Sequence, residues 1–351
     1  MSLPKPKENA VADGRTTMEL GDVLPKTAEV KNGHLFIGGV DMVELAHKEG
    51  TALYVFDEED LRGRIRAYRE SLAKRYPNSE VLYASKAFQN KAMVRLVDEE
   101  GASLDVSGGG ELACARAVGF PMERVYVHGN NKTPTELREA IEAGAGTIVL
   151  DSRIELARVS EIAGELGVEQ NVFMRITPGV EADTHEYIRT GMEDSKFGFT
   201  MLNDFAFNCV GDVLKAPHVH LTGIHMHIGS QIFALHSYDE AIKVGIEFLK
   251  RIKDTYGVEI EKLDIGGGVG VAYMADDKPA TIDQFAEMAT ASVVKHCDEL
   301  GVKHPRILCE PGRSIAATPG VTLYTVGILK TLPGIRKFVA IDGGMSDNIR
   351  T

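Results

Sequence analysis

The chain has 351 residues, of which 44% are hydrophobic and 26% are charged, a composition typical of a globular protein. Its net charge of −12 comes from 39 basic and 51 acidic residues without a basic cluster, so nucleic acid is not expected as a partner. No apolar run approaches the roughly 18 residues of a membrane span, and the polar N-terminus lacks an apolar signal segment, so no membrane association is expected.

Short strand-like runs alternate with longer amphipathic segments along most of the chain. A polar arm comes first, and "GHLFIGG" after it is typical of a short strand between glycines. From Thr51 onward the predicted strands are "ALYVFD", "VLYASK", "SLDVSG", "VYVHGN", "TIVLDS", "VFMRITPG", "GIHMHIGS", "LDIGGG" and "ILCEPGRS". The predicted helices between them include Glu59–Arg75, Lys91–Glu100, Gly110–Val118, Pro134–Ala143 and Tyr238–Tyr256.

This β-α-β alternation predicts an α/β fold with a parallel sheet and helices outside it. At this length a closed (β/α)8 TIM barrel is the leading prediction, and an open doubly wound sheet is the alternative. The chain offers nine runs where a barrel needs eight, and "ALYVFD" is the most doubtful of them.

The pattern changes after Pro311, where "GVTLYTVGILKTL" and "KFVAIDGG" are strand-like with no helix between them. We therefore predict three parts. Residues 1–50 are an N-terminal arm and strand that pack with a β domain, residues 51–315 are the barrel, and residues 316–351 begin a C-terminal β domain that is incomplete.

Polar residues follow many of the predicted strands, at the end of a parallel barrel where active sites lie. They are Lys86, Asp105, His128, Arg175, His225, His227, Asp264 and Glu310. A lysine after a strand is usually a solvated surface residue. A protein selected for stability alone, however, has no need to gather these residue types at one rim, so the set indicates a site.

Three of these elements suggest a phosphate and a flat ring. "GGGVG" after a strand lets backbone N–H groups approach an anion, although glycine runs are also plain turns. The spacing is not that of a dinucleotide fingerprint, so a single phosphate fits better. His225 and His227 share one face, and stacking on an aromatic cofactor is favoured over zinc because no third ligand has a suggestive spacing. Ser230 is placed to donate a hydrogen bond to phosphate.

Glu310 and Arg313 flank a Pro-Gly turn and are either a structural ion pair or two separate functional groups. As functional groups, the carboxylate keeps a pyridine nitrogen protonated and the guanidinium binds phosphate or carboxylate. Together with Lys86 as a Schiff-base nucleophile and His227 on the ring face, they match the needs of pyridoxal 5'-phosphate. The sequence thus predicts Lys86 pointing into the mouth of the barrel.

The motifs "YASKAF", "DVSGGGE", "HGNNK", "HMHIGSQI", "DIGGGVG", "EPGRS" and "DGGMSDNIR" strongly resemble those of diaminopimelate decarboxylase, a fold type III pyridoxal phosphate enzyme. The resemblance runs from about Gly33 to the end of the chain. It implies decarboxylation of meso-2,6-diaminopimelate to L-lysine by a homodimer whose active site is near the interface. The scattered cysteines and the polar N-terminus separately predict a cytoplasmic location.

The resemblance also implies residue roles. Lys86 and His227 are the catalytic pair, one bonded to the cofactor and one stacked on its ring. Arg313 and Arg350 are expected to bind substrate carboxylates. The expected cofactor contacts are Lys86, Asp105, His128, His227, Ser230, Gly267, Gly268, Glu310, Gly312 and Arg313.

The chain departs from the family near its end. It reads "DNIR" where the family has "DNPRP", and it stops at Thr351 without the family's later "CESGD"-like segment and tyrosine. None of the four cysteines (Cys114, Cys209, Cys297 and Cys309) has the matching context, and their scattered spacing is typical of a reducing compartment. We interpret the chain as a fragment that lacks the proton donor.

Two alternatives stay open. One is a barrel that binds pyridoxal phosphate without decarboxylase activity, because the C-terminal half is missing. The other is a related decarboxylase of ornithine, arginine or carboxynorspermidine. A second carboxylate on the substrate calls for a guanidinium at its far end, so Arg350 separates diaminopimelate from these substrates.

Overall fold

The computed structural model of the chain describes residues 23–180, 195–274 and 276–348. The chain divides into two compact units, which are described separately. The barrel unit comprises residues 62–271 and 278–316. The β unit comprises the segments up to residue 61, from 272 to 277 and from 317 onward.

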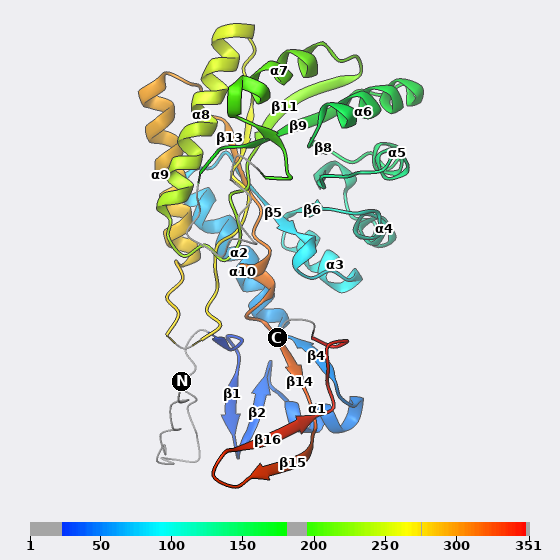
Figure 1. The fold of residues 1–351 in the computed structure, drawn as a ribbon, viewed down its shortest axis with the longest axis vertical. Coiled ribbons are helices and arrows are strands. Elements are labelled where there is room, and N and C mark those ends of the chain that lie inside the picture. The colour runs from blue at the N-terminus through cyan, green and yellow to red at the C-terminus, as the bar shows by residue number, and fades with distance from the viewer. Residues whose placement is uncertain (1–22, 181–194, 275, 349–351) are drawn as a thin grey trace. The chain divides into compact units, whose positions relative to one another are not determined.

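The barrel unit contains a closed ring of parallel strands (Figure 1). Its strands are β5 (Ser79–Ala84), β6 (Ser103–Val106), β7 (Val125–Val127), β8 (Thr147–Leu150), β9 (Gln170–Thr177), β11 (Val219–His225), β12 (Lys262–Asp264) and β13 (Arg306–Cys309). They pair in the order β9-β11-β12-β13-β5-β6-β7-β8, and β8 pairs with β9 to close the ring. The short β10 (Phe199–Thr200) pairs in parallel with the end of β9. The predicted (β/α)8 barrel is confirmed.

Helices connect these strands and lie outside them, as Figure 1 shows for α3 to α6. The helices are α2 (Glu58–Arg75), α3 (Lys91–Glu99), α4 (Gly109–Val118), α5 (Pro134–Glu142), α6 (Arg153–Leu166), α7 (Phe205–Lys215), α8 (His236–Tyr256), α9 (Ile282–Leu300) and α10 (Arg313–Ala316). The 3-10 turns are η2 (Ser85–Ala87), η3 (Met122–Arg124) and η5 (Leu202–Asp204). The helices predicted from the sequence end within about two residues of those observed.

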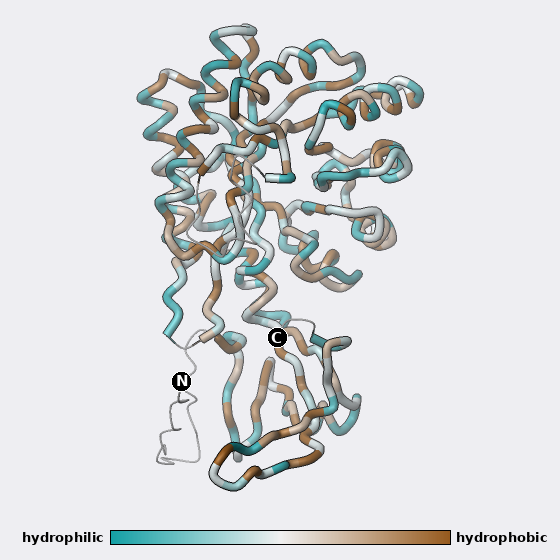
Figure 2. The backbone as a smooth tube through the Cα atoms, viewed as in Figure 1, coloured by the Kyte–Doolittle hydropathy of each residue, from teal (hydrophilic) through white to brown (hydrophobic). Residues whose placement is uncertain are grey.

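Local sequence explains where several helices begin. Thr133 and Glu136 form a capping box at the start of α5, with Pro134 in the first turn. Thr281 and Gln284 do the same for α9. In Figure 2 hydrophilic and hydrophobic segments alternate along the outer helices, as expected of helices with one buried face.

The interior of the barrel is filled by side chains from different strands. Leu82, Tyr126, Val149, Phe173 and Leu308 form one buried cluster. These residues come from β5, β7, β8, β9 and β13 in turn. The barrel is thus a packed core, and ligands are expected at its ends rather than inside it.

The β unit is built from antiparallel pairs. Strands β1 (Glu29–Lys31), β2 (His34–Ile37) and β3 (Val40–Asp41) form one sheet, followed by α1 (Met42–Glu49). Strand β4 (Leu53–Phe56) pairs with β14 (Gly320–Leu323), and β15 (Val326–Leu332) pairs with β16 (Arg336–Ile341). The doubtful run "ALYVFD" therefore forms β4, which lies in the predicted range 51–315 but pairs with β14 and not with the barrel strands. Among the described residues, no helix combines the length and apolarity needed to cross a bilayer.

Candidate active site

The C-terminal ends of the barrel strands bring together the rim residues predicted from the sequence. Lys86 lies in η2 directly after β5, and its Nζ is 3.9 Å from Asp105 Oδ2 at the end of β6. His128 follows β7, and its Nε2 is 3.9 Å from Asp105 Oδ1. Asp105 is buried, whereas the Lys86 side chain is 55% exposed. Lys86 therefore remains accessible to a ligand while it faces a buried carboxylate.

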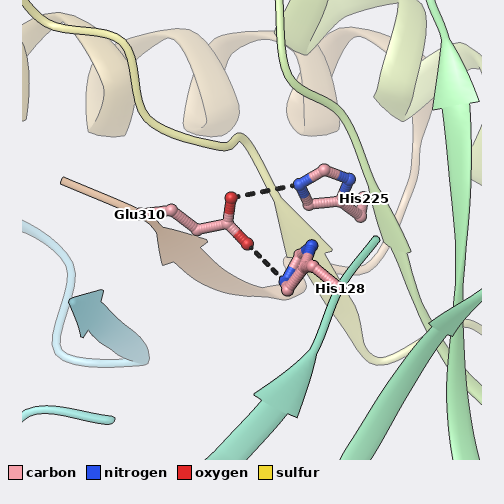
Figure 3. Close-up of side chains that lie close together, drawn as sticks. All are labelled: His128, His225 and Glu310. Carbon is pink, nitrogen blue, oxygen red and sulfur yellow. Dashed lines mark hydrogen bonds and ion pairs between the residues drawn. The ribbon is translucent and has the colours of Figure 1, made fainter. Parts of the chain in front are cut away.

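Glu310 lies between two histidines from different strands (Figure 3). Glu310 Oε1 is 2.9 Å from His128 Nε2, and Glu310 Oε2 is 3.2 Å from His225 Nε2. The two imidazole rings meet edge to face at 4.9 Å, and all three side chains are buried. The carboxylate is held at both oxygens, which fixes its plane at the mouth of the barrel.

The same three residues have the composition of a metal site. One ligand atom from each of His128, His225 and Glu310 lies within 4.8 Å of the others. Because Glu310 already contacts both imidazoles, their closeness is accounted for without a cation. The expectation that no metal is bound stays a prediction.

The pKa values of two neighbouring buried carboxyl groups, Glu310 and Asp264, are shifted in opposite directions. Burial raises the pKa of Glu310, but His128 and His225 outweigh it, so that pKa lies well below its ordinary value. Burial, followed by the charge of Glu310, raises the pKa of Asp264 well above its ordinary value. Glu310 is therefore the stronger acid of the two, while Asp264 Oδ1 accepts the N–H of Gly266 at 2.8 Å.

His227 faces the triple-glycine loop. Its Nδ1 accepts the N–H of Gly267 at 3.2 Å, so the neutral ring carries its proton on Nε2. Burial, followed by the charge of Lys86, lowers the pKa of His227 well below its ordinary value. His225 and His227 thus have different partners. His225 supports Glu310, whereas His227 is a neutral ring that keeps part of its surface open.

The loops after β11, β12 and β13 meet at one place. Arg313 Nε and Nη2 donate to Ser230 Oγ, each at 3.1 Å. A Cβ on Gly267 would lie 2.0 Å from the Glu310 carbonyl oxygen, and one on Gly268 would lie 2.2 Å from the Gly229 oxygen. Glycine is required here because the three backbones approach closely. The loops after the seventh and eighth strands are the usual phosphate site of this barrel fold.

Gly312 connects this region to the Lys86 turn. A Cβ on Gly312 would lie 3.0 Å from the Ala84 Cβ and 3.1 Å from the Ala84 oxygen. The Ala84 N–H donates to the Pro311 carbonyl at 3.2 Å. The turn that carries Lys86 therefore packs directly on the loop that carries Arg313.

Three sets of residues complete the comparison with the sequence: one that was noted without a role, one that was missed, and one that lies outside the described residues. Arg175 is buried at the end of β9, and its guanidinium lies 4.4 Å from the centre of the Phe197 ring. Lys132 and Glu155 form a buried ion pair that the sequence did not indicate, because its members are 23 positions apart and belong to different segments. Arg350 lies outside the described residues.

The sequence matches the family model described as "Pyridoxal-dependent decarboxylase, pyridoxal binding domain" over residues 60–317. Diaminopimelate decarboxylase of Bacillus subtilis is 45% identical over 320 residues, which are 91% of this chain and 73% of that protein. The enzyme of Mycobacterium tuberculosis H37Rv is 42% identical over 339 residues, 94% of this chain and 75% of that protein.

Solved structures agree with these matches. A diaminopimelate decarboxylase from M. jannaschii in complex with L-lysine superposes with a TM-score of 0.87 at 36% identity, covering 93% of this chain and 75% of that one. A Helicobacter pylori diaminopimelate decarboxylase with L-lysine gives a TM-score of 0.78 at 28% identity, covering 86% of this chain and 73% of that one.

Proposed function

Because the chain belongs to the pyridoxal-dependent decarboxylases, and within them to the diaminopimelate decarboxylase family, we propose roles for its site residues in that family's reaction. The reaction removes the carboxylate at the D-centre of meso-2,6-diaminopimelate and yields L-lysine and carbon dioxide, the last step of lysine biosynthesis. The observation that supports these roles best is the arrangement of Lys86, Asp105 and Glu310 at one end of the barrel.

The residues present fit pyridoxal phosphate. The carboxylate of Asp105 is buried, and neither of its oxygens has a hydrogen bond within the described part of the chain, so this wall accommodates a further polar group. Glu310 supplies an ionised carboxylate in a buried setting, which suits a protonated ring nitrogen. Ser230 and Arg313 supply a hydroxyl and a guanidinium at the loops where barrels of this fold bind phosphate.

The carbon–carbon bond breaks when the substrate carboxylate leaves. When bound, pyridoxal phosphate supplies an aromatic system that takes up the electron pair left behind. We assign Lys86 as the amine that bonds to the cofactor, because it is accessible and follows β5 directly. We assign Glu310 to hold a proton at the ring nitrogen, with His128 and His225 fixing its carboxylate, and His227 to cover one face of the ring.

We assign phosphate binding to Ser230, Gly267, Gly268, Gly312 and Arg313. Their close backbones and paired side chains support this role.

Arg313 follows Pro311 and Gly312, which pack on the Lys86 turn, and this supports a second role for Arg313 in binding a substrate carboxylate. We assign Arg350 to the far carboxylate of the substrate, which selects a dicarboxylic amino acid over ornithine or arginine.

We further propose that the protein works as a homodimer in the cytoplasm. The resemblance to the family supports the dimer. All four cysteines are free thiols, which is the state expected in a reducing compartment.

The first experiment compares the unaltered chain with Lys86→Ala and Lys91→Ala after loading with pyridoxal phosphate. Lys91 is an exposed lysine five positions further along and is the matched control. We expect any carbon dioxide released by the unaltered chain and by Lys91→Ala to come from meso-diaminopimelate and not from L-ornithine or L-arginine. Reduction with borohydride followed by peptide mapping is expected to find the cofactor on Lys86.

Two results would contradict this assignment. If borohydride reduction still attaches the cofactor covalently to Lys86→Ala, Lys86 is not the residue that bonds to it. Release from ornithine or arginine equal to that from diaminopimelate would remove the substrate assignment. Attachment at Lys86 without release from any of the three substrates would instead support a barrel that binds the cofactor without decarboxylating.

A further inference from the structure

Lys132 is a buried lysine whose ammonium has a full set of partners. Its Nζ donates to the Gly129 oxygen at 2.6 Å and to the Val149 oxygen at 2.8 Å. It also lies 2.6 Å from Glu155 Oε1, and the two side chains are only 4% and 6% exposed. Two of its three N–H donors thus have carbonyl acceptors, and its charge faces the Glu155 carboxylate.

Glu155 connects Lys132 to helix α6 and to the backbone that follows β8. It lies in the first turn of α6, and its Oε2 accepts the N–H of Asp151 at 3.0 Å. Lys132 belongs to the segment after β7, whereas Val149 lies in β8 and Asp151 follows its last residue. The Lys132–Glu155 pair therefore joins the loop after β7 to the end of β8 and the start of α6.

The backbone held by this pair is that of the residue after His128. Gly129 has φ +120°, and a Cβ there would lie 3.5 Å from both Lys132 Cγ and the Ser107 oxygen. On its other side the His128 N–H donates to the Val106 oxygen at 2.7 Å. His128 is thus fixed from β6 by its own N–H and from β8 through Gly129 and Lys132.

A role in stability alone explains this pair poorly. Removing two charges from water costs much of what their attraction returns, so a buried ion pair is weak evidence for stability. The Lys132–Glu155 pair lies at the end of the barrel that carries the site, and both its backbone acceptors flank the strand ends there. Its position is that of a support for His128.

We propose that Lys132 and Glu155 are positioning residues that hold His128 against Glu310. Through that contact they keep the Glu310 carboxylate where it meets the ring nitrogen of the cofactor. Lys132 and Glu155 act through His128. This proposal rests on the proposed function for the role of Glu310, but the contact between His128 and Glu310 is a property of the chain itself.

The test uses Lys132→Met and Glu155→Gln, with Glu100→Gln as the matched control. Glu100 is also a buried carboxylate of the barrel unit, bound by Arg62 and Arg66. Glu155→Gln keeps the side-chain size, removes the charge and replaces one acceptor oxygen with an amide NH2, so it remains informative if Lys132→Met does not fold. Each variant is compared with the control at equal fraction folded, as measured by denaturant unfolding.

In the loaded enzyme we expect kcat to fall about tenfold to a hundredfold with KM little changed, since small misplacements at a reacting centre have effects of this size. The pH dependence of the cofactor's absorption band is expected to shift in both variants and not in Glu100→Gln. Combining Lys132→Met with His128→Asn is expected to add little to His128→Asn alone, because the two changes act on one contact.

A second readout does not depend on the cofactor. In the cofactor-free protein, NMR of the His128 ring nitrogens is expected to show altered chemical shifts in Lys132→Met and Glu155→Gln, and unaltered ones in Glu100→Gln. Unchanged His128 signals in folded variants would overturn the proposal whatever the activity. Altered His128 signals in the two variants, together with no carbon dioxide release by the unmodified chain, would overturn the proposed function and leave the positioning role standing.

Discussion

Glu310 and Asp264 are both carboxylic acids in the same part of the barrel, yet their neighbours shift their pKa values in opposite directions. Glu310 faces two imidazoles that lower its pKa, whereas burial and the charge of Glu310 raise the pKa of Asp264. Because two adjacent buried carboxylates would repel each other, opposite pKa shifts favour a single charge on the pair. The arrangement of neighbours, and not the residue type, decides which carboxyl acts.

His225 links this arrangement to pH. Burial lowers its pKa to about 4 from an ordinary value of 6.5. Between pH 6.5 and pH 4 His225 therefore binds a proton in the unfolded chain but not in the folded one. Its contribution to the free energy of unfolding is full above pH 6.5 and is lost as the pH falls toward 4. We expect this residue alone to lower the free energy of unfolding by on the order of 2 kcal/mol between pH 7 and pH 5.

Denaturant unfolding of the barrel at pH 7, 6 and 5 measures this effect. His225→Gln removes the titrating ring and keeps a donor for Glu310, so its unfolding free energy is expected to fall less steeply over the same range. His47→Gln, a change at an exposed histidine of the β unit, is the control and is expected to keep the steep fall. Parallel profiles for the unaltered chain and His225→Gln would contradict the assignment.

At the scale of the elements, the barrel depends on one small residue in β11. A Cβ on Gly223 would lie 2.4 Å from the ring of Phe173 on the neighbouring β9. The register between β9 and β11 also shifts next to this glycine. The Phe173 ring belongs to the core cluster, so Gly223 makes room for a core side chain against the strand backbone.

We expect Gly223→Ala to lower the free energy of unfolding by about 1–3 kcal/mol, because the added methyl group overpacks the core. Phe173→Leu in the same chain is expected to recover part of this loss, so the double variant is more stable than the sum of the single changes predicts. Gly110→Ala is the control, since its Cβ meets nothing within 4 Å. Additive losses in denaturant unfolding would show that the two residues do not compete for space.

At the scale of the whole molecule, the β15–β16 hairpin exposes an unusual amount of apolar surface. Its residues with the largest exposed fractions are Ile328 and Ile335, both at 73%. Other exposed apolar residues of this region are Val326, Leu329, Phe338, Val339, Ile341 and Met345. Exposed apolar residues concentrated in one element are a feature of interfaces when they form a patch.

We expect the purified chain to self-associate with rising concentration and Ile328→Asp to weaken this association, because a charge opposes burial of the hairpin. Light scattering over a concentration series measures it. Ile154→Asp is the control, since Ile154 is 67% exposed but lies alone on α6 of the barrel unit. An equal effect of both changes, or of neither, would argue against association through the hairpin.

Much of the barrel was predictable because its signals are local. Apolar strand runs, helix caps and strand-end polar residues each depend on a few consecutive positions, and the helices begin and end close to where the sequence placed them. Because these signals are local, they could not show which of the nine predicted strands lies outside the barrel. "ALYVFD" has the composition of a barrel strand, and only its pairing with β14, more than 260 positions later, places it in the β unit.

The sequence by itself determined the α/β alternation, the lysine after the first barrel strand and the polar rim, since these follow from residue order along single elements. The tertiary structure decided which side chains meet. Glu310 contacts His225, which is 85 positions away, and Lys132 contacts Glu155, because ring closure places the ends of separate strands side by side. Charge and burial at those meeting points then lower the pKa of one carboxyl and raise that of the other, and no stretch of sequence contains that information.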